Sequence, residues 1–377
     1  MRSTRLALIA AGMGLTLAVS ACGANQDNSS NSGDGGQSST GSSAGGIPVG
    51  VILPETASSA RWEGFDRPML EAALKAQGLD PHIENAQGDV QKFSTLADGM
   101  INDGVKVLII ASINSEVGGT VAQKANAQGI PTIDYDRLNL GGSSSFYVSF
   151  DNVKVGELQG QGLIDALKDK PKGAQVIEIE GAPTDNNATL FHNGQENKLK
   201  PLYEDGTLKL VQSQPIDNWD NQKGGTTFEN ILTANGTKVD GVVAANDGLA
   251  GAIITVLKKY KLNGTVPVTG QDATADGLKA ILTGDQYMTV FKPIKQEAEA
   301  TAKLAAALAK GDKSGAAKIA TDKENDPVGK RDVPSVLLEP FLITKDSVKK
   351  VIDEGYVKAE EVCTGDLAAT CSQLGIS

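Results

Sequence analysis

The chain is poor in the residue types that attack substrates, transfer protons or bind metals. It contains two histidines, His82 and His192, which lie 110 residues apart, and three cysteines with no Cys-x-x-Cys spacing. A zinc site or a histidine-based catalytic triad therefore has little basis in this sequence. We expect a protein that is not an enzyme, with no catalytic residue, no metal and no cofactor.

Planar polar side chains and two tryptophans are what the sequence offers instead, and they follow a series of short apolar runs. These residues are Arg61, Trp62, Asp136, Arg137, Asp185, Asn186, Asn187, Asp217, Trp219, Asn246, Asp247, Gln271, Asp272 and Lys292. Carboxylate, amide and guanidinium groups can engage two neighbouring hydroxyls of a sugar at once. Indole rings cover the apolar C–H faces of a pyranose well. These residue types predict a carbohydrate-binding site.

Each of these residues also has a purely structural interpretation. Asp136 and Arg137 can form an ion pair at a strand end, which by itself stabilises little. We expect Asn186 to cap a helix and Asn187 to contact the ligand. In the pair Asn246–Asp247, one residue is expected to cap a helix while the other binds. The ligand-binding interpretation is preferred for the group as a whole because the residues recur after successive apolar runs.

Apolar runs alternate with longer amphipathic stretches from Ile47 onward, a pattern typical of strands and crossover helices. The predicted strands are Pro48–Leu53, Val105–Ala111, Pro131–Tyr135, Phe146–Phe150, Gln175–Ile179, Leu208–Gln212, Gly241–Ala245, Val266–Thr269 and Met288–Phe291. The predicted helices are Glu63–Gln77, Val90–Asp103, Glu116–Gln128, Val153–Lys168, Asn187–Tyr203, Gly248–Tyr260, Ala275–Leu282 and Ile294–Ala309. Ligands of open parallel sheets sit beyond the carboxyl ends of the strands, where the polar set lies.

Roughly ten strands exceed one comfortable open sheet, so the α/β body is expected to form two doubly wound parallel-sheet lobes. We expect residues 47–151 plus 293–333 in the N-terminal lobe and residues 152–292 plus 334–377 in the C-terminal lobe. The chain would then cross between the lobes three times, the last time within residues 334–340. The three crossings would form the hinge.

The first 46 residues have the features of an export signal and a tether. Arg2 and Arg5 precede an apolar stretch too short for a membrane span, and the segment ends in Val-Ser-Ala-Cys at Cys22. Residues 1–21 are predicted to be a lipoprotein-type signal peptide, with Cys22 lipidated. Residues 22–46 are nearly all polar or glycine and are predicted to be a flexible tether. The body would be held on the outer face of the cytoplasmic membrane.

The net charge is −11 and no Lys/Arg-rich run occurs, which argues against nucleic acid as a partner. The remaining cysteines, Cys363 and Cys371, are eight residues apart near the C-terminus. Outside the cytoplasm such a pair is expected to form a disulfide that clamps the tail. We expect a monomer, attached to the membrane only by its lipid anchor.

Several segments together resemble the periplasmic-type sugar-binding proteins of ABC transporters, in the ribose/galactose/xylose-binding class. The resemblance runs from about Val49 to about Tyr356 and is strong only when the segments are taken in order. They are Ala60–Trp62, Ile133–Arg137, Phe146–Gln159, Gly181–Ala188, Val243–Asp247, Gly270–Ala273, Met288–Pro293 and Asp332–Ser335. The resemblance implies the type I binding-protein fold, with two lobes and a three-crossing hinge.

The resemblance also implies roles for the residues of the N-terminal lobe. In the family's pattern, the residue at the position of Arg61 hydrogen-bonds the sugar. The residue at the position of Trp62 stacks on it. The positions of Asp136 and Arg137 make paired polar contacts. The loop 54–59 departs from the family's more charged loop, which puts a ligand contact from that loop in doubt.

In the rest of the chain, the resemblance places Asn187 in the cleft and makes Trp219 the second stacking aromatic. Asn246, Asp272 and Lys292 match contacts from the C-terminal lobe and the hinge. The implied ligand is a monosaccharide, an aldose with D-xylose expected first, and the implied partner is the transmembrane permease of an ABC importer. Closure of the lobes would bury the sugar and present a docking surface.

Three alternatives of other kinds remain open to test. A receptor of the same fold could bind glucose, galactose or arabinose for sensing rather than uptake. A sugar-responsive repressor would need a basic N-terminal DNA-binding domain, where this chain has its leader and tether. A glycosidase would need a general acid, and Arg137 and Lys292 would keep nearby Asp136 and Asp272 ionised.

Overall fold

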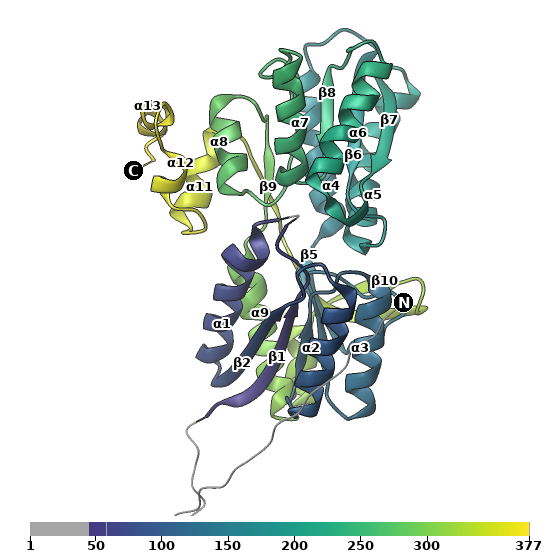
Figure 1. The fold of residues 1–377 in the computed structure, drawn as a ribbon, viewed down its shortest axis with the longest axis vertical. Helices are drawn as coiled ribbons and strands as arrows, with labels where there is room; N and C mark the ends of the chain where they lie inside the picture. The colour runs from purple at the N-terminus through teal and green to yellow at the C-terminus, as the bar shows by residue number, and fades with distance from the viewer. Residues whose placement is uncertain (1–44, 58, 377) are drawn as a thin grey trace, which may run out of the picture. The chain divides into compact units, whose positions relative to one another are not determined.

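The computed structural model of the chain describes residues 45–57 and 59–376. The predicted signal peptide, the predicted lipidation site Cys22 and nearly all of the predicted tether lie outside the described residues. No helix in the described part is long and apolar enough to cross a membrane. The described residues form an α/β body built on two main sheets (Figure 1).

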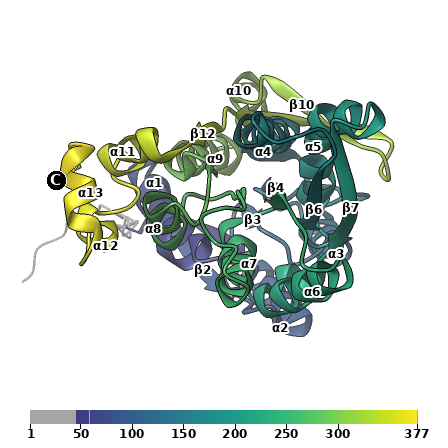
Figure 2. The ribbon, with the colours of Figure 1, turned by 90° about the horizontal axis from the view of Figure 1, so that it is seen from above.

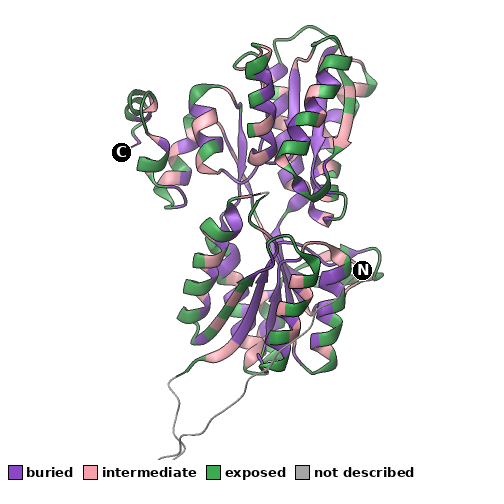
Figure 3. Cartoon of the chain, viewed as in Figure 1, coloured by how far each residue is buried: buried purple, intermediate pink, exposed green. Residues whose placement is uncertain are grey.

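The first sheet has seven strands in the order β10-β11-β5-β4-β3-β1-β2, and all neighbours are parallel except β10 and β11. Its strands are β1 (Ile47–Leu53), β2 (Leu79–Asn85), β3 (Leu108–Ile110), β4 (Thr132–Tyr135), β5 (Phe146–Phe150), β10 (Asp322–Asp326) and β11 (Arg331–Leu338). The central strands are buried on both faces (Figure 3), which explains their nearly continuous apolar sequences.

Helices cover both faces of this sheet. They are η1 (Trp62–Asp66), α1 (Arg67–Ala76), α2 (Val90–Asn102), α3 (Ser115–Ala127), α9 (Ile294–Ala309) and α10 (Lys313–Ile319). Val51 and Ile109 pack with α1 and α9 on one face, whereas Ile52 and Ile110 pack with α2 and α3 on the other. Successive residues of a strand point to opposite faces, so one strand serves both cores.

The second lobe repeats this plan on a smaller parallel sheet, in the order β7-β6-β8. Its elements are α4 (Asn152–Leu167), β6 (Ala174–Glu180), α5 (Asn186–Glu204), β7 (Leu208–Pro215), η2 (Asp217–Trp219), α6 (Asn221–Ala234), β8 (Gly241–Ala244) and α7 (Asp247–Lys259). Ile177 and Ile179 pack against α6 and α7, whereas Val176 packs against α4 and α5. Figure 2 shows this sheet with its helices from above.

The last part of the body surrounds a two-stranded antiparallel ribbon of β9 (Thr289–Phe291) and β12 (Phe341–Ile343). The helices here are α8 (Ala275–Thr283), η3 (Lys345–Ser347), α11 (Val348–Asp353), α12 (Ala359–Val362) and α13 (Leu367–Gln373). They share one core with Phe291 and Ile294. Cys363 and Cys371 form a disulfide within this tail.

The fold has the predicted class, with two parallel-sheet lobes. Two details of the prediction are wrong. Residues 334–338 do not belong to the second lobe, because β11 stays hydrogen-bonded to β5 as far as Leu338. Val266–Thr269 forms no full strand and makes only an isolated bridge from Val268 to Val242, because β8 ends at Ala244 and no longer run is available for pairing.

Candidate functional site

A small cavity of about 30 Å³ lies between the carboxyl ends of strands from the two lobes and the chain crossing at Lys292. All nine site residues predicted from the sequence line it. The full lining is Ser59, Arg61, Trp62, Asp136, Arg137, Asp185, Asn187, Phe191, Trp219, Asn246, Gln271, Asp272 and Lys292. The placement follows from the fold, because the polar turns after parallel strands meet at one edge of each sheet.

Arg61, at the start of η1, is held in place by three carboxylates. Its Nε and Nη2 donate to Asp66 at 2.9 and 2.7 Å, and its Nη1 donates to Asp136 at 2.6 Å. Its Nη2 also donates to Glu297 of α9 at 3.1 Å. Tyr135 completes the group by donating its hydroxyl to Asp66 at 2.7 Å. The guanidinium therefore has one fixed position at the cavity wall.

At this wall, the pKa values of Asp136 and Glu297 are shifted in opposite directions. Burial acts to raise the pKa of Asp136, but the cationic groups of Arg61, Lys292 and Arg137 outweigh it and hold that pKa below its usual value. Burial, with the charge of Asp136 next, raises the pKa of Glu297 well above its usual value. Asp136 is therefore the ionised acceptor of this group.

Trp62 presents its ring to two cations. The Arg61 guanidinium lies 4.6 Å from the ring centroid and that of Arg137 lies 5.1 Å from it. Such contacts favour Arg over the face of an indole. The Trp62 side chain is 1% exposed, and its Nε1–H has no hydrogen-bond partner among the described residues. A buried indole N–H normally finds an acceptor, so this atom is open to a ligand.

Several polar contacts join the lobes at the cavity. Arg137 Nε lies 3.0 Å from Asp185 Oδ2, and Asn187 Nδ2 donates to the Asp136 backbone oxygen at 2.9 Å. Ser59 of the first lobe donates its hydroxyl to Asp272 at 3.1 Å. These contacts connect side chains that are far apart in the sequence.

Trp219 approaches the cavity from η2 with an unusual backbone, at φ 56°. Its Nε1 donates to Asp185 Oδ2 at 3.1 Å, and its ring meets Phe191 edge-on at 6.4 Å between centroids. The ring also lies against Gly181, where a Cβ would come within 2.1 Å of Trp219 Cη2. The indole position thus depends on a residue without a side chain.

Helix starts bring the second lobe's polar residues to the cavity. Asp185, rather than Asn186 as predicted, caps α5 by accepting from the Asn187 backbone N–H at 3.0 Å. Asn246 caps α7 by accepting a hydrogen bond from the Leu249 N–H at 2.8 Å, and Asn246 also lines the cavity. A cap must lie directly after its strand, which is also where the ligand edge of the sheet lies.

Asp247, the other residue predicted either to cap or to bind, is absent from the cavity lining. It instead accepts hydrogen bonds from Thr274, Gln286 and Thr289. Its function is to hold the turn that presents Gln271 and Asp272. Asn246 therefore caps and lines the cavity, and Asp247 does neither, which corrects the expected division between the two.

Lys292 lies where the chain crosses from β9 to α9. Its Nζ is 3.3 Å from Asp272 Oδ1 and 3.8 Å from Asp136 Oδ2. Phe150 and Phe191 flank it, with ring centroids 5.6 and 5.9 Å from Nζ. The lysine therefore connects a carboxylate of each lobe at the crossing.

The lining is balanced in charge and suits an uncharged ligand. Three cationic groups of the lining meet three carboxylates, and no excess of either sign is left for an ionic ligand. Besides Trp62 Nε1, the buried atoms Gln271 Oε1 and Asp272 Oδ1 lack a hydrogen-bond partner in the described part of the chain. Donors and acceptors left open in this way match the hydroxyls of a polyol.

Four lining residues are outside the nine predicted contacts: Ser59, Asp185, Phe191 and Gln271. Phe191 follows Asn187 by one helical turn, so helical periodicity could have identified it. Asp185 and Gln271 were among the polar residues noted after the apolar runs, but no ligand contact was assigned to them. Nothing in the loop 54–59 marked Ser59, because its contact to Asp272 depends on how the lobes meet.

A larger cavity of about 410 Å³ adjoins the small one and shares Arg137 and Trp219 with it. Its walls come from both lobes, for example Gln87 on one side and Gln222 on the other.

Comparison with known proteins shows which families and structures this chain is similar to. A family model described as a periplasmic binding protein domain matches residues 49–313. The D-xylose-binding periplasmic protein of Escherichia coli K12 is 39% identical over 80% of this chain and 88% of its own length. A multiple sugar-binding periplasmic receptor of Rhizobium radiobacter is 35% identical over 83% of this chain and 92% of its own length.

Among solved structures, an ABC transporter solute-binding protein of Clostridium phytofermentans with bound β-D-glucose is 31% identical to this chain. The match covers 84% of this chain and 99% of the other, with a TM-score of 0.76. The two-lobed fold, the enclosed polar cavity and these similarities lead to one conclusion. The chain belongs to the periplasmic sugar-binding protein family, the non-catalytic solute-binding proteins of ABC transporters.

Proposed function

We propose that this protein captures an aldose, D-xylose, in the cavity between its lobes and delivers it to the membrane permease of an ABC importer. It acts outside the cytoplasm as a monomer. We propose further that Cys22 is acylated and holds the body on the outer face of the membrane. The observation that carries the sugar-binding proposal is the convergence of charged, amide and indole groups from both lobes on one enclosed, charge-balanced cavity.

The choice of D-xylose rests on the relatives. The two D-xylose-binding periplasmic proteins match at 39% and 38% identity over 80% of this chain. The solute-binding proteins with bound glucose match at 31%. The cavity's open donors and acceptors suit both sugars equally, and the higher identity supports D-xylose as the proposal.

The proposed contacts follow from the geometry. Trp62 and Trp219 stack on the sugar, while Arg61, Asp136 and Arg137 hydrogen-bond it from the first lobe. From the second lobe and the hinge, its hydroxyls are bound by Asn187, Asn246, Asp272 and Lys292. Asp272 carries particular weight because its Oδ1 has no hydrogen-bond partner in the described structure.

The proposal is tested by isothermal titration of the full chain with D-xylose, D-glucose, D-galactose and L-arabinose. We expect one sugar to bind per chain, with D-xylose the tightest. If no aldose gives heat, the sugar-binding proposal is wrong. If another aldose binds more tightly than D-xylose, only the choice of sugar is wrong.

Asp272→Asn provides the matched variant. A hydrogen bond to a charged group contributes about 1.5–3 kcal/mol, so we expect D-xylose to bind at least about tenfold more weakly. Asp276→Asn is the control, because Asp276 is an exposed residue of α8 paired only with Lys279. Equal affinities of the two variants would remove Asp272 from the site.

A further inference from the structure

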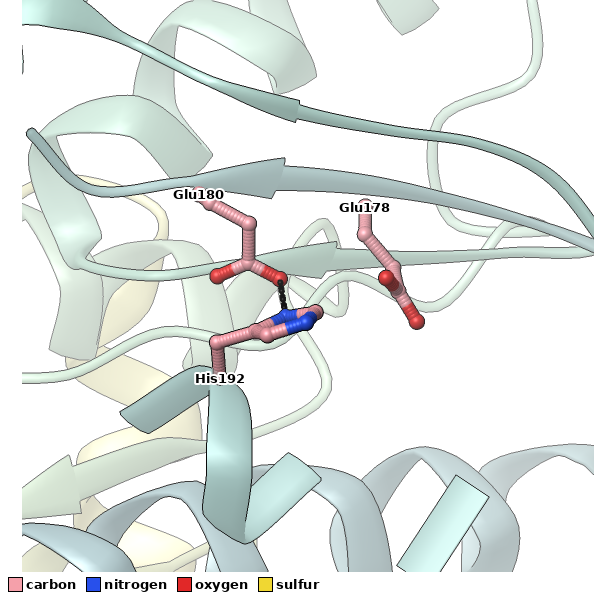
Figure 4. A group of neighbouring side chains, drawn as sticks. All are labelled: Glu178, Glu180 and His192. Carbon is pink, nitrogen blue, oxygen red and sulfur yellow. Dashed lines mark hydrogen bonds and ion pairs between the residues drawn. The ribbon is translucent and has the colours of Figure 1, made fainter. Parts of the chain in front are cut away.

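A second cluster of ionisable side chains lies on β6 and α5, outside the sugar cavity. Glu178 and Glu180 are two residues apart on β6 and point to the same face of the strand, toward His192 of α5 (Figure 4). One ligand atom from each of the three lies within 4.8 Å of the others. His192 Nδ1 is 3.3 Å from Glu180 Oε1.

A fourth side chain, Gln195, points its amide oxygen at Glu180 with no donor between them. The Gln159 Nε2 donates to the backbone oxygens of Ala245 and Gly270, at 3.0 and 3.2 Å, which fixes the Gln159 amide. Gln159 Oε1 therefore accepts from Gln195 Nε2 at 2.8 Å. The Gln195 oxygen is left 2.6 Å from Glu180 Oε1.

The alternative orientation of Gln195 does not solve this conflict. Turning the amide over would let it donate to Glu180, but would bring its oxygen within 2.8 Å of Gln159 Oε1. Gln159 cannot turn as well, since its own oxygen would then face the backbone carbonyls. Gln195 is 1% exposed, so water does not relieve the contact. Two oxygens held this close need a proton or a metal cation between them.

Glu178 adds a second unpaired oxygen to the cluster. Its Oε1 accepts from the Tyr203 hydroxyl at 2.7 Å, but its Oε2 is buried without a hydrogen-bond partner among the described residues. Glu178 Oε2 is therefore an open acceptor beside Glu180 and His192.

We propose that Glu178, Glu180, His192 and Gln195 bind one divalent transition-metal cation, Zn²⁺ or Mn²⁺. Two carboxylates and an imidazole are common ligands of such ions, and an amide oxygen completes four. At metal–ligand distances of about 2.0–2.1 Å, tetrahedral ligand atoms lie about 3.3 Å apart, close to the separation of His192 Nδ1 and Glu180 Oε1. The 2.6 Å between the Gln195 oxygen and Glu180 Oε1 would lengthen when the ion binds. The imidazole ligand disfavours Mg²⁺ and Ca²⁺, which prefer oxygen.

The cation would cross-link β6 to α5, the pair of elements that carries Asp185, Asn187 and Phe191 to the sugar cavity. None of its four ligands lines that cavity. Its effect is therefore on the stability of the second lobe, and the site does not depend on the proposed sugar. The His192 side chain is 39% exposed, which leaves a path for the ion from solvent.

The test uses the full chain without a histidine tag, on a Cys22→Ser background so that no free thiol binds metal. The protein is stripped with a chelator and dialysed against Zn²⁺, Mn²⁺, Mg²⁺ or Ca²⁺. Bound metal is measured by mass spectrometry, and the melting temperature by calorimetry. We expect one Zn²⁺ or Mn²⁺ per chain and a rise in melting temperature, with Mg²⁺ and Ca²⁺ giving neither.

His192→Gln is expected to weaken Zn²⁺ binding at least tenfold, measured by competition with a chromophoric chelator. His82→Gln is the matched control, because His82 is exposed on β2 and lies near only Asp80. Unchanged circular dichroism of His192→Gln shows that the variant is folded. No stoichiometric uptake, equal binding by His192→Gln, or equal stabilisation by Mg²⁺ overturns the proposal.

Discussion

The side chains around the sugar cavity hold one another by charge. Arg61 is buried with Asp66, Asp136 and Glu297, and each contact is 3.1 Å or shorter. Removing one partner of a buried ion pair costs about 3–5 kcal/mol, because the other charge is left uncompensated. A guanidinium held in this way loses its rotamer freedom during folding rather than when the ligand binds.

The buried carboxyl group of Asp134 predicts how the stability of the fold depends on pH. Asp134 lies fully buried in β4 and accepts hydrogen bonds from Asn139 and Ser144. Burial raises its pKa from 3.8 to about 6. Between these values the unfolded chain has lost its proton while the folded chain keeps it. The free energy of unfolding should therefore fall as pH rises from about 4, by up to about 3 kcal/mol, and level off above pH 6.

The measurement is urea unfolding of the full chain and of Asp134→Asn between pH 4 and pH 7.5. Any change that the substitution itself makes to the free energy of unfolding does not depend on pH. As pH rises over this range, the free energy of unfolding of the unaltered chain should fall by up to about 3 kcal/mol relative to that of Asp134→Asn. A difference that stays constant with pH would contradict the raised pKa of Asp134.

At the scale of elements, the turn between β6 and α5 sets the shape of the second half of the cavity. Asp185 caps α5, pairs with Arg137 and accepts from Trp219. Gly181, directly after β6, leaves room for the Trp219 ring. One short turn thus positions a helix, an ion pair and an indole.

We expect Gly181→Ala to displace Trp219, because the added Cβ would lie 2.1 Å from Cη2 of its ring. Sugar affinity should fall by at least about tenfold, since a stacked aromatic side chain contributes roughly 1 kcal/mol and Asp185 would lose a donor as well. Titration calorimetry measures the affinity, and near-ultraviolet circular dichroism reports the indole environment.

Gly251→Ala is the matched control for this substitution. A Cβ at Gly251 of α7 meets no atom within 4 Å, and alanine favours a helix more than glycine does. Unchanged sugar affinity and spectrum in Gly181→Ala would show that Trp219 does not depend on the space at Gly181.

At the scale of the whole molecule, the cavity implies that the lobes separate before the sugar enters. A volume of about 30 Å³ equals roughly the share of one water molecule in the liquid, far less than a pyranose needs. The closed arrangement also leaves Trp62 Nε1 without a hydrogen-bond partner among the described residues, at a cost of about 1–3 kcal/mol. The closed state should therefore be favoured when a ligand supplies this hydrogen bond.

Small-angle scattering of the full chain tests this closure. The radius of gyration should decrease when D-xylose is added at a saturating concentration, because hinge closure brings the lobes together. Asp272→Asn should need at least about tenfold more D-xylose for the same decrease. A radius that does not change in the unaltered chain would contradict the hinge-closure mechanism.

Local pattern predicted the uniformly buried strands of the first sheet and missed both of that sheet's edge strands, although it found β7, an edge strand of the second sheet. Continuous apolar runs identified β1 and β3 to β5, which are buried on both faces. β2 was missed, because this edge strand is partly exposed and carries Pro81 and charged residues. β10 was missed for the same reason, since its residues are mostly polar.

The sequence by itself determined the fold class, the two lobes and the residue types of the sugar cavity, because burial periodicity and strand-end polarity are local signals. It could not show which side chains meet across the lobes, such as Ser59 with Asp272, or that Gln195 opposes Glu180 beside His192. Only the tertiary structure decided these contacts. They join positions brought together by sheet order and helix packing, which no spacing along the chain records.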